Sequence, residues 1–89
     1  MGFNNLFQAL ADETRRKILE LLKEQDLSAG QIGKNFPISP PSITHHLNVL
    51  KNADLVSNRR EGQEIIYSIN LSVFEEAANL LIKFFQTKK

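Results

Sequence analysis

The feature that most limits the possible folds is a gap of only three residues between two short predicted helices. Residues 36–38, Phe-Pro-Ile, separate a helix that starts after Ser28 from one that starts after Ser39. The first helix must end before Pro37, because the residue ahead of a proline avoids the α region. Pro40 takes the first position of the second helix, where its missing N–H costs nothing. Two helices joined by so short a turn are typical of a helix-turn-helix.

Polar residues stand where these helices and the preceding one should begin. Ser28 and Gln31 have the three-residue spacing of a capping box, in which each side chain bonds to the other residue's backbone. Nearer the N-terminus, Asp12 is expected to cap a helix that ends near Gln25. A short amphipathic helix over residues 3–10 precedes it, since apolar residues there repeat every three or four positions.

After the helix pair, the hydrophobic period changes from that of a helix to that of a strand. Residues 55–59 and 64–69 alternate as in two strands, and residues 60–63 lie between them as a turn. Gly62 can take the positive φ that such a turn requires. A β-hairpin directly after a helix-turn-helix predicts a winged helix-turn-helix, with the wing over about residues 56–69.

A chain of 89 residues makes one domain, here residues 1–89, and buries only about 60% of its unfolded surface. No cysteine is present to add a disulfide or a thiolate metal site, so assembly into an oligomer is the usual remaining support. The N-terminus lacks a basic stretch followed by a long apolar one, and we therefore expect a cytoplasmic protein.

The distribution of charge distinguishes one stretch of the chain from the rest. Residues 27–53 contain no Asp or Glu, whereas ten acids among 89 residues would place about three in a stretch of that length. Lys34, Lys51, Arg59 and Arg60 add cations to the helix pair and the wing. This pattern favours contact with phosphates, and the alternative is a solvated face that merely lacks charge.

The second helix of the pair, over about residues 40–53, is the one that enters the major groove in a helix-turn-helix. At 100° per residue, Ile43, Leu47 and Leu50 face inward and short polar side chains face outward. Such side chains suit base edges and phosphates, although an ordinary hydrated face is the alternative. The wing arginines are placed at the hairpin tip, near the minor groove, unless the tip is merely solvated. The expected DNA-binding residues are Ser39, Pro40, Pro41, Ser42, Thr44, His45, Asn48, Lys51, Arg59 and Arg60.

His45 and His46 do not suit a metal site. Adjacent residues lie about 100° apart on a helix, whereas helical metal pairs need a spacing of three or four. Neither a cysteine nor a third histidine is present to complete a site. We therefore expect no metal and no cofactor, with His46 at the edge of the core and His45 on DNA. The basic run of residues 15–17 is interpreted as a structural charged face, because nearby glutamates neutralise it.

Five of the six phenylalanines lie near the two ends of the chain. A last helix is expected from a capping box of Ser72 and Glu75 to about Gln86, and its apolar stripe is too wide for one small core. A two-fold dimer through the first and last helices would bury the excess, and the alternative is packing within one subunit. The expected fold is mainly α (α+β), with element order α-α-α-α-β-β-α. The expected dimer-interface residues are Phe3, Leu6, Phe7, Leu10, Leu81, Phe84 and Phe85.

Three motifs, in this order, resemble those of the ArsR-type (arsenical-resistance-repressor) winged-helix regulators, and most closely those of small members without cysteine. They are Leu10-Ala-Asp-Glu-Thr-Arg-Arg-Lys-Ile-Leu19, Ser39-x-x-Ser-Ile-Thr-His-His-Leu-x-x-Leu50 and Val56-x-x-Arg-Arg-x-Gly62. The resemblance spans nearly the whole chain. It implies a homodimeric transcriptional repressor that binds double-stranded DNA at an inverted-repeat operator.

The resemblance also implies which positions contact DNA, namely Pro40, Pro41, Thr44 and His45. Two prolines cannot donate backbone hydrogen bonds, so the emphasis shifts from them to Thr44 and His45, together with their neighbours Ser42 and Asn48. Ser39 remains a cap and a candidate phosphate ligand.

The family's metal sites are not expected in this chain. A cysteine-containing site would fall around residues 28–32, where no such ligand is present, and residues 70–89 contain no histidine for a site on the last helix. Derepression would then need another route, such as sequestration by a membrane partner or an unidentified ligand. The alternative function is a winged-helix protein-interaction module that does not bind DNA. An enzyme is not expected, because no nucleophile with a positioned base, paired carboxylates or phosphate loop is visible.

Overall fold

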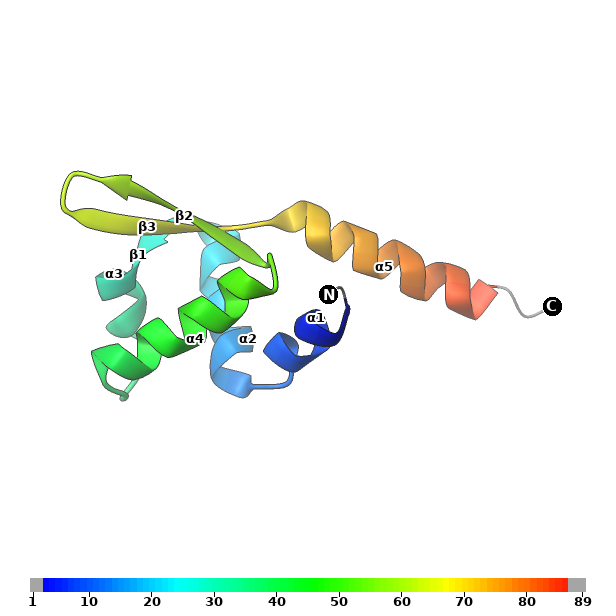
Figure 1. The fold of residues 1–89 in the computed structure, drawn as a ribbon, viewed down its shortest axis with the longest axis horizontal. Helices are drawn as coiled ribbons and strands as arrows, with labels where there is room; N and C mark the ends of the chain where they lie inside the picture. The colour runs from blue at the N-terminus through cyan, green and yellow to red at the C-terminus, as the bar shows by residue number, and fades with distance from the viewer. Residues whose placement is uncertain (1–2, 87–89) are drawn as a thin grey trace.

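The computed structural model describes residues 3–86, and for Phe3 it describes the backbone alone. Over these residues the predicted order of four helices, a hairpin and a last helix is confirmed, with one short additional strand (Figure 1). The elements are α1 (Phe3–Leu10), α2 (Glu13–Glu24), β1 (Leu27–Ser28), α3 (Ala29–Gly33), α4 (Pro40–Asn52), β2 (Val56–Glu61), β3 (Glu64–Ile69) and α5 (Leu71–Gln86).

Side-chain caps begin three of the helices where the sequence predicts them. At α2, the carboxylate of Asp12 accepts a hydrogen bond from the backbone N–H of Arg15 at 3.0 Å. At α3, the capping box of Ser28 and Gln31 is complete, with hydrogen bonds of 3.1 and 2.9 Å. At α4, Ser39 is the N-cap and two prolines follow it. Helices α3 and α4 therefore form the predicted helix-turn-helix. The connection is longer than predicted, because α3 already ends at Gly33 and residues 34–39 separate the two helices.

Strand β1 is absent from the predicted order. Leu27 and Ser28 pair with Tyr67 and Ile66 of β3 in antiparallel register, which gives a three-stranded sheet of order β1-β3-β2. A segment of two residues is too short to show a hydrophobic period, so its pairing depends on the tertiary structure. The strand joins the wing to the start of the helix-turn-helix.

The tip of the wing also differs from the prediction. Strand β2 continues to Glu61 and leaves only Gly62 and Gln63 in the turn. Gly62 has the expected positive φ, of 64°. Two-residue hairpin loops favour glycine because they need this left-handed conformation. Arg59 and Arg60 therefore lie within β2, where they pair with β3, and their predicted place at the tip is wrong.

One hydrophobic core joins the helices to the sheet. On α4 its members are Ile43, Leu47 and Leu50, each at most 2% exposed, which confirms the predicted inward stripe. The helix is thus held along its whole length, and its opposite side is left in solvent. The other buried members are Leu6, Ala9, Ile18, Leu19, Leu22, Ile32, Leu55, Val56 and Tyr67.

The exit from α4 into the wing is shaped by Asp54, whose φ is 62°. Its backbone N–H donates to the carbonyl of Lys51 at 2.9 Å, and that of Leu55 donates to the carbonyl of Leu50 at 3.0 Å. This is a Schellman pattern, in which glycine is the usual left-handed residue. The side-chain amide of Asn70 donates to the carbonyl of Asp54 at 3.0 Å, which ties the start of α5 to the same corner.

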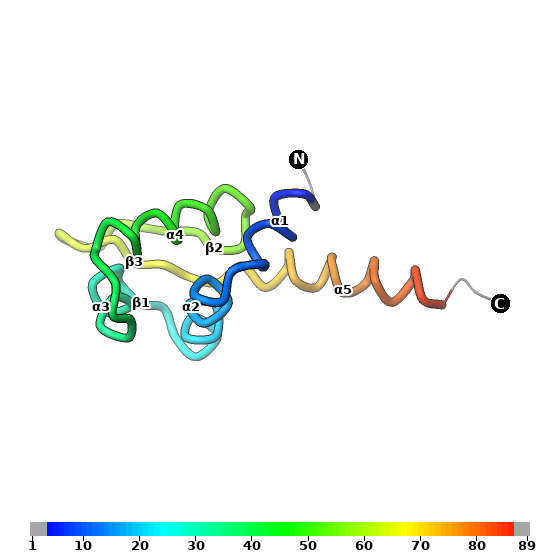
Figure 2. The backbone as a smooth tube through the Cα atoms, turned by 90° about the horizontal axis from the view of Figure 1, so that it is seen from below, coloured from blue at the N-terminus to red at the C-terminus, as the bar shows by residue number. Residues whose placement is uncertain are grey.

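Helix α5 projects away from the rest of the molecule (Figures 1 and 2). None of its residues is buried, and the molecule measures 53 Å along its longest axis against 24 Å across. The helix begins at Leu71, one residue before the predicted cap. Instead of capping the helix, Ser72 Oγ donates a hydrogen bond to Asn70 Oδ1 at 2.9 Å. The first turns pack against the core through Val73 and Phe74.

Candidate nucleic-acid interface

The outward face of α4 carries most of the residues predicted to bind DNA. The buried stripe on the inner face of the helix leaves this side in solvent, as entry into a DNA groove requires. The exposed residues on or beside the helix are Ser39, Pro40, Pro41, Thr44, His45, Asn48 and Lys51, and Ser42 is half-buried.

The first turn of α4 limits how this helix can approach DNA. Ser39 Oγ accepts a hydrogen bond from the backbone N–H of Ser42 at 3.3 Å and donates one to Ser42 Oγ at 3.2 Å. Pro40 and Pro41 have no N–H to offer a phosphate at the helix start. Any hydrogen-bond donor that this helix offers to DNA is therefore a side chain and not one of these first backbone positions.

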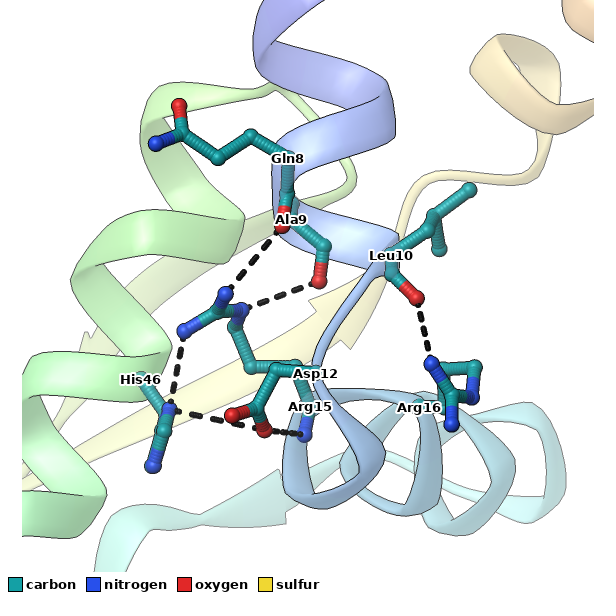
Figure 3. A network of polar contacts seen from close by, with 7 residues as sticks. All are labelled: Gln8, Ala9, Leu10, Asp12, Arg15, Arg16 and His46. Carbon is teal, nitrogen blue, oxygen red and sulfur yellow. Dashed lines mark hydrogen bonds and ion pairs between the residues drawn. The ribbon is translucent and has the colours of Figure 1, made fainter.

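Behind α4, the guanidinium of Arg15 joins three helices (Figure 3). It donates to the carbonyls of Gln8 and Ala9 at the end of α1, at 3.1 and 2.9 Å, and lies 3.1 Å from His46 Nδ1 on α4. Because the guanidinium can only donate, His46 Nδ1 is the acceptor. The carboxylate of Asp12 lies 4.0 Å from the same nitrogen. His46 is half-buried at the edge of the core, as predicted, and holds α4 against α1 and α2.

Arg16 also contacts the end of α1, donating to the carbonyl of Leu10 at 2.7 Å (Figure 3). The last carbonyls of a helix have no partner within it and carry partial negative charge, so cations there are stabilising. The interpretation of residues 15–17 as structural is confirmed for both arginines, although they bond to the carbonyls of α1 and not to the glutamates that the sequence suggested. No local pattern in the sequence indicates that Arg15 reaches His46, which lies 31 positions away.

Replacing Asp12 by alanine should destabilise the fold and make it less sensitive to acid. The backbone N–H of Arg15 holds the pKa of the Asp12 carboxyl below its ordinary value of 3.8, outweighing the effect of burial. Because the folded pKa is depressed, this stabilisation is present above the ordinary value and is lost as pH falls through the folded pKa. At neutral pH, Asp12→Ala should lower the free energy of unfolding by about 1 kcal/mol, measured by urea denaturation.

The matched control is Ser39→Ala, which removes an uncharged cap. It should cost a similar free energy of unfolding without changing the acid profile. Equal loss of stability in acid by the wild type and Asp12→Ala would contradict the assignment of this pH dependence to Asp12.

The two wing arginines differ in what they contact. The guanidinium of Arg59 donates to Glu61 at 2.8 Å, to Asp26 at 3.0 Å and to Ser68 at 3.1 Å. The hydrogen bond from Arg59 lowers the pKa of the Asp26 carboxyl, and the bonds to Glu61 and Asp26 raise the pKa of Arg59. The side chain of Arg60 is exposed and makes no hydrogen bond or ion pair with residues 3–86. The wing cation that remains available to a phosphate is Arg60, whereas Arg59 is already paired with two carboxylates.

The predicted dimer-interface residues fall into two groups. Leu6 is only 3% exposed and belongs to the core of its own subunit, so its prediction as an interface residue is corrected. Leu10 is half-buried against the same core, and the side chain of Phe3 lies outside the described residues. The exposed group, with 47% to 75% of each side chain accessible, is Phe7, Leu81, Phe84 and Phe85.

Metal ligands do not gather among residues 3–86, where no group of three or more His, Cys, Asp or Glu side chains is placed to share an ion. The adjacent rings of His45 and His46 lie with centroids 5.6 Å apart and planes tilted by 56°. Over the same part of the chain, no helix has the length and apolar character needed to span a bilayer.

Comparison with known proteins agrees with this geometry. The family model for bacterial regulatory proteins of the arsR family matches residues 12–58, from the cap of α2 into the wing. The chain belongs to the arsR family. This confirms the resemblance carried by its three sequence motifs. As an arsR-family member with a winged helix-turn-helix, it is a DNA-binding transcriptional regulator and not an enzyme.

Individual relatives and solved structures match over most of their length. The transcriptional repressor SdpR of Bacillus subtilis is 52% identical over 91% of this chain and 90% of its own. An ArsR-like transcriptional regulator from Rhodococcus is 34% identical, with a TM-score of 0.84 over 92% of this chain and 77% of that one. A homodimeric winged helix-turn-helix DNA-binding domain from Mycobacterium bovis is 26% identical. Its TM-score is 0.76 over 93% of this chain and 78% of that one.

Proposed function

We propose that two copies of this chain bind an inverted-repeat DNA operator and repress transcription, including transcription of their own gene. The observation that carries the proposal is the outward face of α4, where short polar side chains lie in a stretch without acids, on a helix anchored by a buried stripe. A helix fits the major groove, and such side chains can bond to base edges. This activity would place the protein with the chromosome, in the cytoplasm.

The exposed apolar surface of α5 supports the homodimer. Phe84 and Phe85, at its far end, are 69% and 75% exposed. Apolar patches of this kind mark interaction sites, and a two-fold dimer buries the same patch on both copies. Such a dimer can place two copies of α4 about 34 Å apart, which is one turn of DNA. The homodimeric relative from Mycobacterium bovis supports the same assembly.

We assign the proposed contacts according to chemistry and accessibility. Thr44, His45 and Asn48 would contact base edges, because they are exposed and can donate or accept hydrogen bonds. Lys51 and Arg60 would contact phosphates. The start of α4 would shape the interface through its cap and its prolines, at Ser39, Pro40, Pro41 and Ser42. Arg59, which is bonded to a carboxylate, would brace the wing.

Replacing His45 by alanine should reduce the preference for the operator over a scrambled duplex. A base contact made by this side chain is worth about 1–3 kcal/mol of discrimination. The measurement is an anisotropy titration with the promoter region upstream of the protein's own gene, against a scrambled duplex of equal length. The control is Asn79→Ala, a change on exposed α5 that should leave the preference unchanged.

Salt provides a second test of the proposed DNA binding. Operator affinity should fall steeply with salt, because each phosphate contact releases counterions. An affinity that does not depend on salt would contradict the proposal. An intact dimer that binds none of the promoter region would favour the alternative, a winged-helix protein-interaction module.

For relief of repression, we propose a route other than metal binding, such as sequestration by a membrane partner or an unidentified ligand. The supporting observation is that the positions of the family's metal sites, around residues 28–32 and 70–89, contain neither cysteine nor histidine. Operator binding should therefore be unchanged by added zinc or arsenite. Loss of binding on addition of either metal would contradict this part of the proposal.

A further inference from the structure

A polar cleft lies between α1 and the outer side of α4, and we call it the α1–α4 cleft. Its volume is about 380 Å³. The lining contains a guanidinium, an imidazole and three amide side chains, and it contains no carboxylate. The cleft therefore offers hydrogen-bond donors and one positive charge to whatever enters it. The lining residues are Asn5, Gln8, Arg15, His45, Val49 and Asn52.

The cleft is continuous with the face of α4 that is proposed to contact DNA. His45 and Asn52 belong both to the outward face of α4 and to the lining of the cleft. The major groove is about 12 Å wide, and a helix with its side chains has a diameter of about 10–12 Å. A helix in the groove therefore lies close to a phosphate strand on each side. On one side of α4 lies α3, and on another lies α1, next to the last turns of α4 (Figures 1 and 2).

The two α1 side chains at the cleft are exposed and positioned by a well-anchored helix. Asn5 and Gln8 make no side-chain hydrogen bond with residues 3–86. The side chain of Gln8 extends from α1 toward α4 (Figure 3). The guanidinium of Arg15 bonds to the carbonyls of Gln8 and Ala9, so the position of the α1 end relative to α4 is set before any DNA is bound.

We propose that the α1–α4 cleft receives the phosphate backbone of one DNA strand beside the half-site read by α4. Asn5 and Gln8 would donate side-chain N–H groups to phosphate oxygens, with Asn52 opposite them and the charge of Arg15 beneath. Helix α1 would thus contact DNA as well as the second subunit. This inference rests on the proposed function and extends it to an element outside the helix-turn-helix and the wing.

The test introduces a negative charge at Gln8 in one variant and a positive charge in another. The DNA affinity of each is compared with that of a variant that has the same change at a control position. Gln8→Glu should weaken DNA binding about tenfold at low salt by repelling the phosphates. Gln8→Lys should strengthen binding about threefold and steepen the dependence of log affinity on log salt by about 0.9. The matched controls are Gln25→Glu and Gln25→Lys at the exposed end of α2, away from the cleft, where each effect should be under about twofold.

Both Gln8 effects should be equal on the promoter duplex and on a scrambled duplex, because phosphates carry no sequence information. Sedimentation should show all four variants as dimers. If wild type binds DNA and the Gln8 pair behaves like the Gln25 pair, this inference fails while the proposed function stands. If wild type binds no DNA, the proposed function itself fails.

A free anion is the other occupant that this lining could hold. In that case inorganic phosphate, added at constant ionic strength, would change operator binding by the wild type and would not change it for Gln8→Glu. That result would assign the cleft to a small anion and overturn the proposal. An equal response of both proteins to phosphate supports the DNA strand as the occupant.

Discussion

Leu47→Ala should remove a large part of the folding stability of the chain. Leu47 is fully buried at the middle of α4, and truncating such a leucine costs about 2–5 kcal/mol. The total free energy of unfolding of a domain of this size is about 5–13 kcal/mol. The variant should therefore melt many degrees lower than wild type and lose operator binding at a lower temperature. Urea and thermal denaturation followed by circular dichroism measure both losses.

The neighbouring residue provides the control for Leu47. Asn48 follows it on α4 but is exposed, so Asn48→Ala should change the unfolding free energy by about 0.5 kcal/mol or less. The two variants should therefore separate stability from DNA recognition on one helix. A Leu47→Ala protein as stable as the wild type would contradict the packing described for α4.

Phe85→Asp should dissociate the proposed dimer and weaken operator binding by about 100-fold or more. Phe85 is 75% exposed at the far end of α5, and an interface there would have to bury the new carboxylate. A single subunit loses the gain of binding two linked half-sites, which is about 10²–10⁴ in affinity. Sedimentation equilibrium and operator titration measure the two effects, and the melting of the core should barely change.

The matched control is Asn79→Asp, which adds the same charge on the polar side of the same helix. It should leave both the assembly and the operator affinity close to those of wild type. Dimers that persist in Phe85→Asp at micromolar concentration would place the interface away from the end of α5.

Local signals in the sequence were sufficient to predict the helices and the hairpin. Ser28 with Gln31, and Ser39 ahead of Pro40, mark helix starts through hydrogen bonds that span three residues. The inward stripe of α4 follows from helical periodicity alone. The outward face, on which the candidate DNA interface depends, follows from the same periodicity.

The remaining features depend on contacts between residues that are distant in sequence. Arg15 meets His46 across 31 positions, and Arg59 meets Asp26 across 33. Composition and periodicity contain no information about which cation will meet which carboxylate or ring. For this reason the sequence predicts Arg59 as a DNA-binding wing cation, although the structure pairs it with two carboxylates. Asp54 is a similar case, because the left-handed position that it takes usually selects glycine.

The projecting α5 has a consequence for how such regulators diversify. Beyond its first turns this helix adds nothing to the core, so its outer residues can change without unfolding the chain. If the proposed dimer forms through α5, substitutions there could redirect which subunits pair, for example toward mixed dimers with a paralogue, while the proposed DNA-reading helix keeps its specificity. Choice of partner and choice of DNA sequence can therefore evolve separately in this architecture.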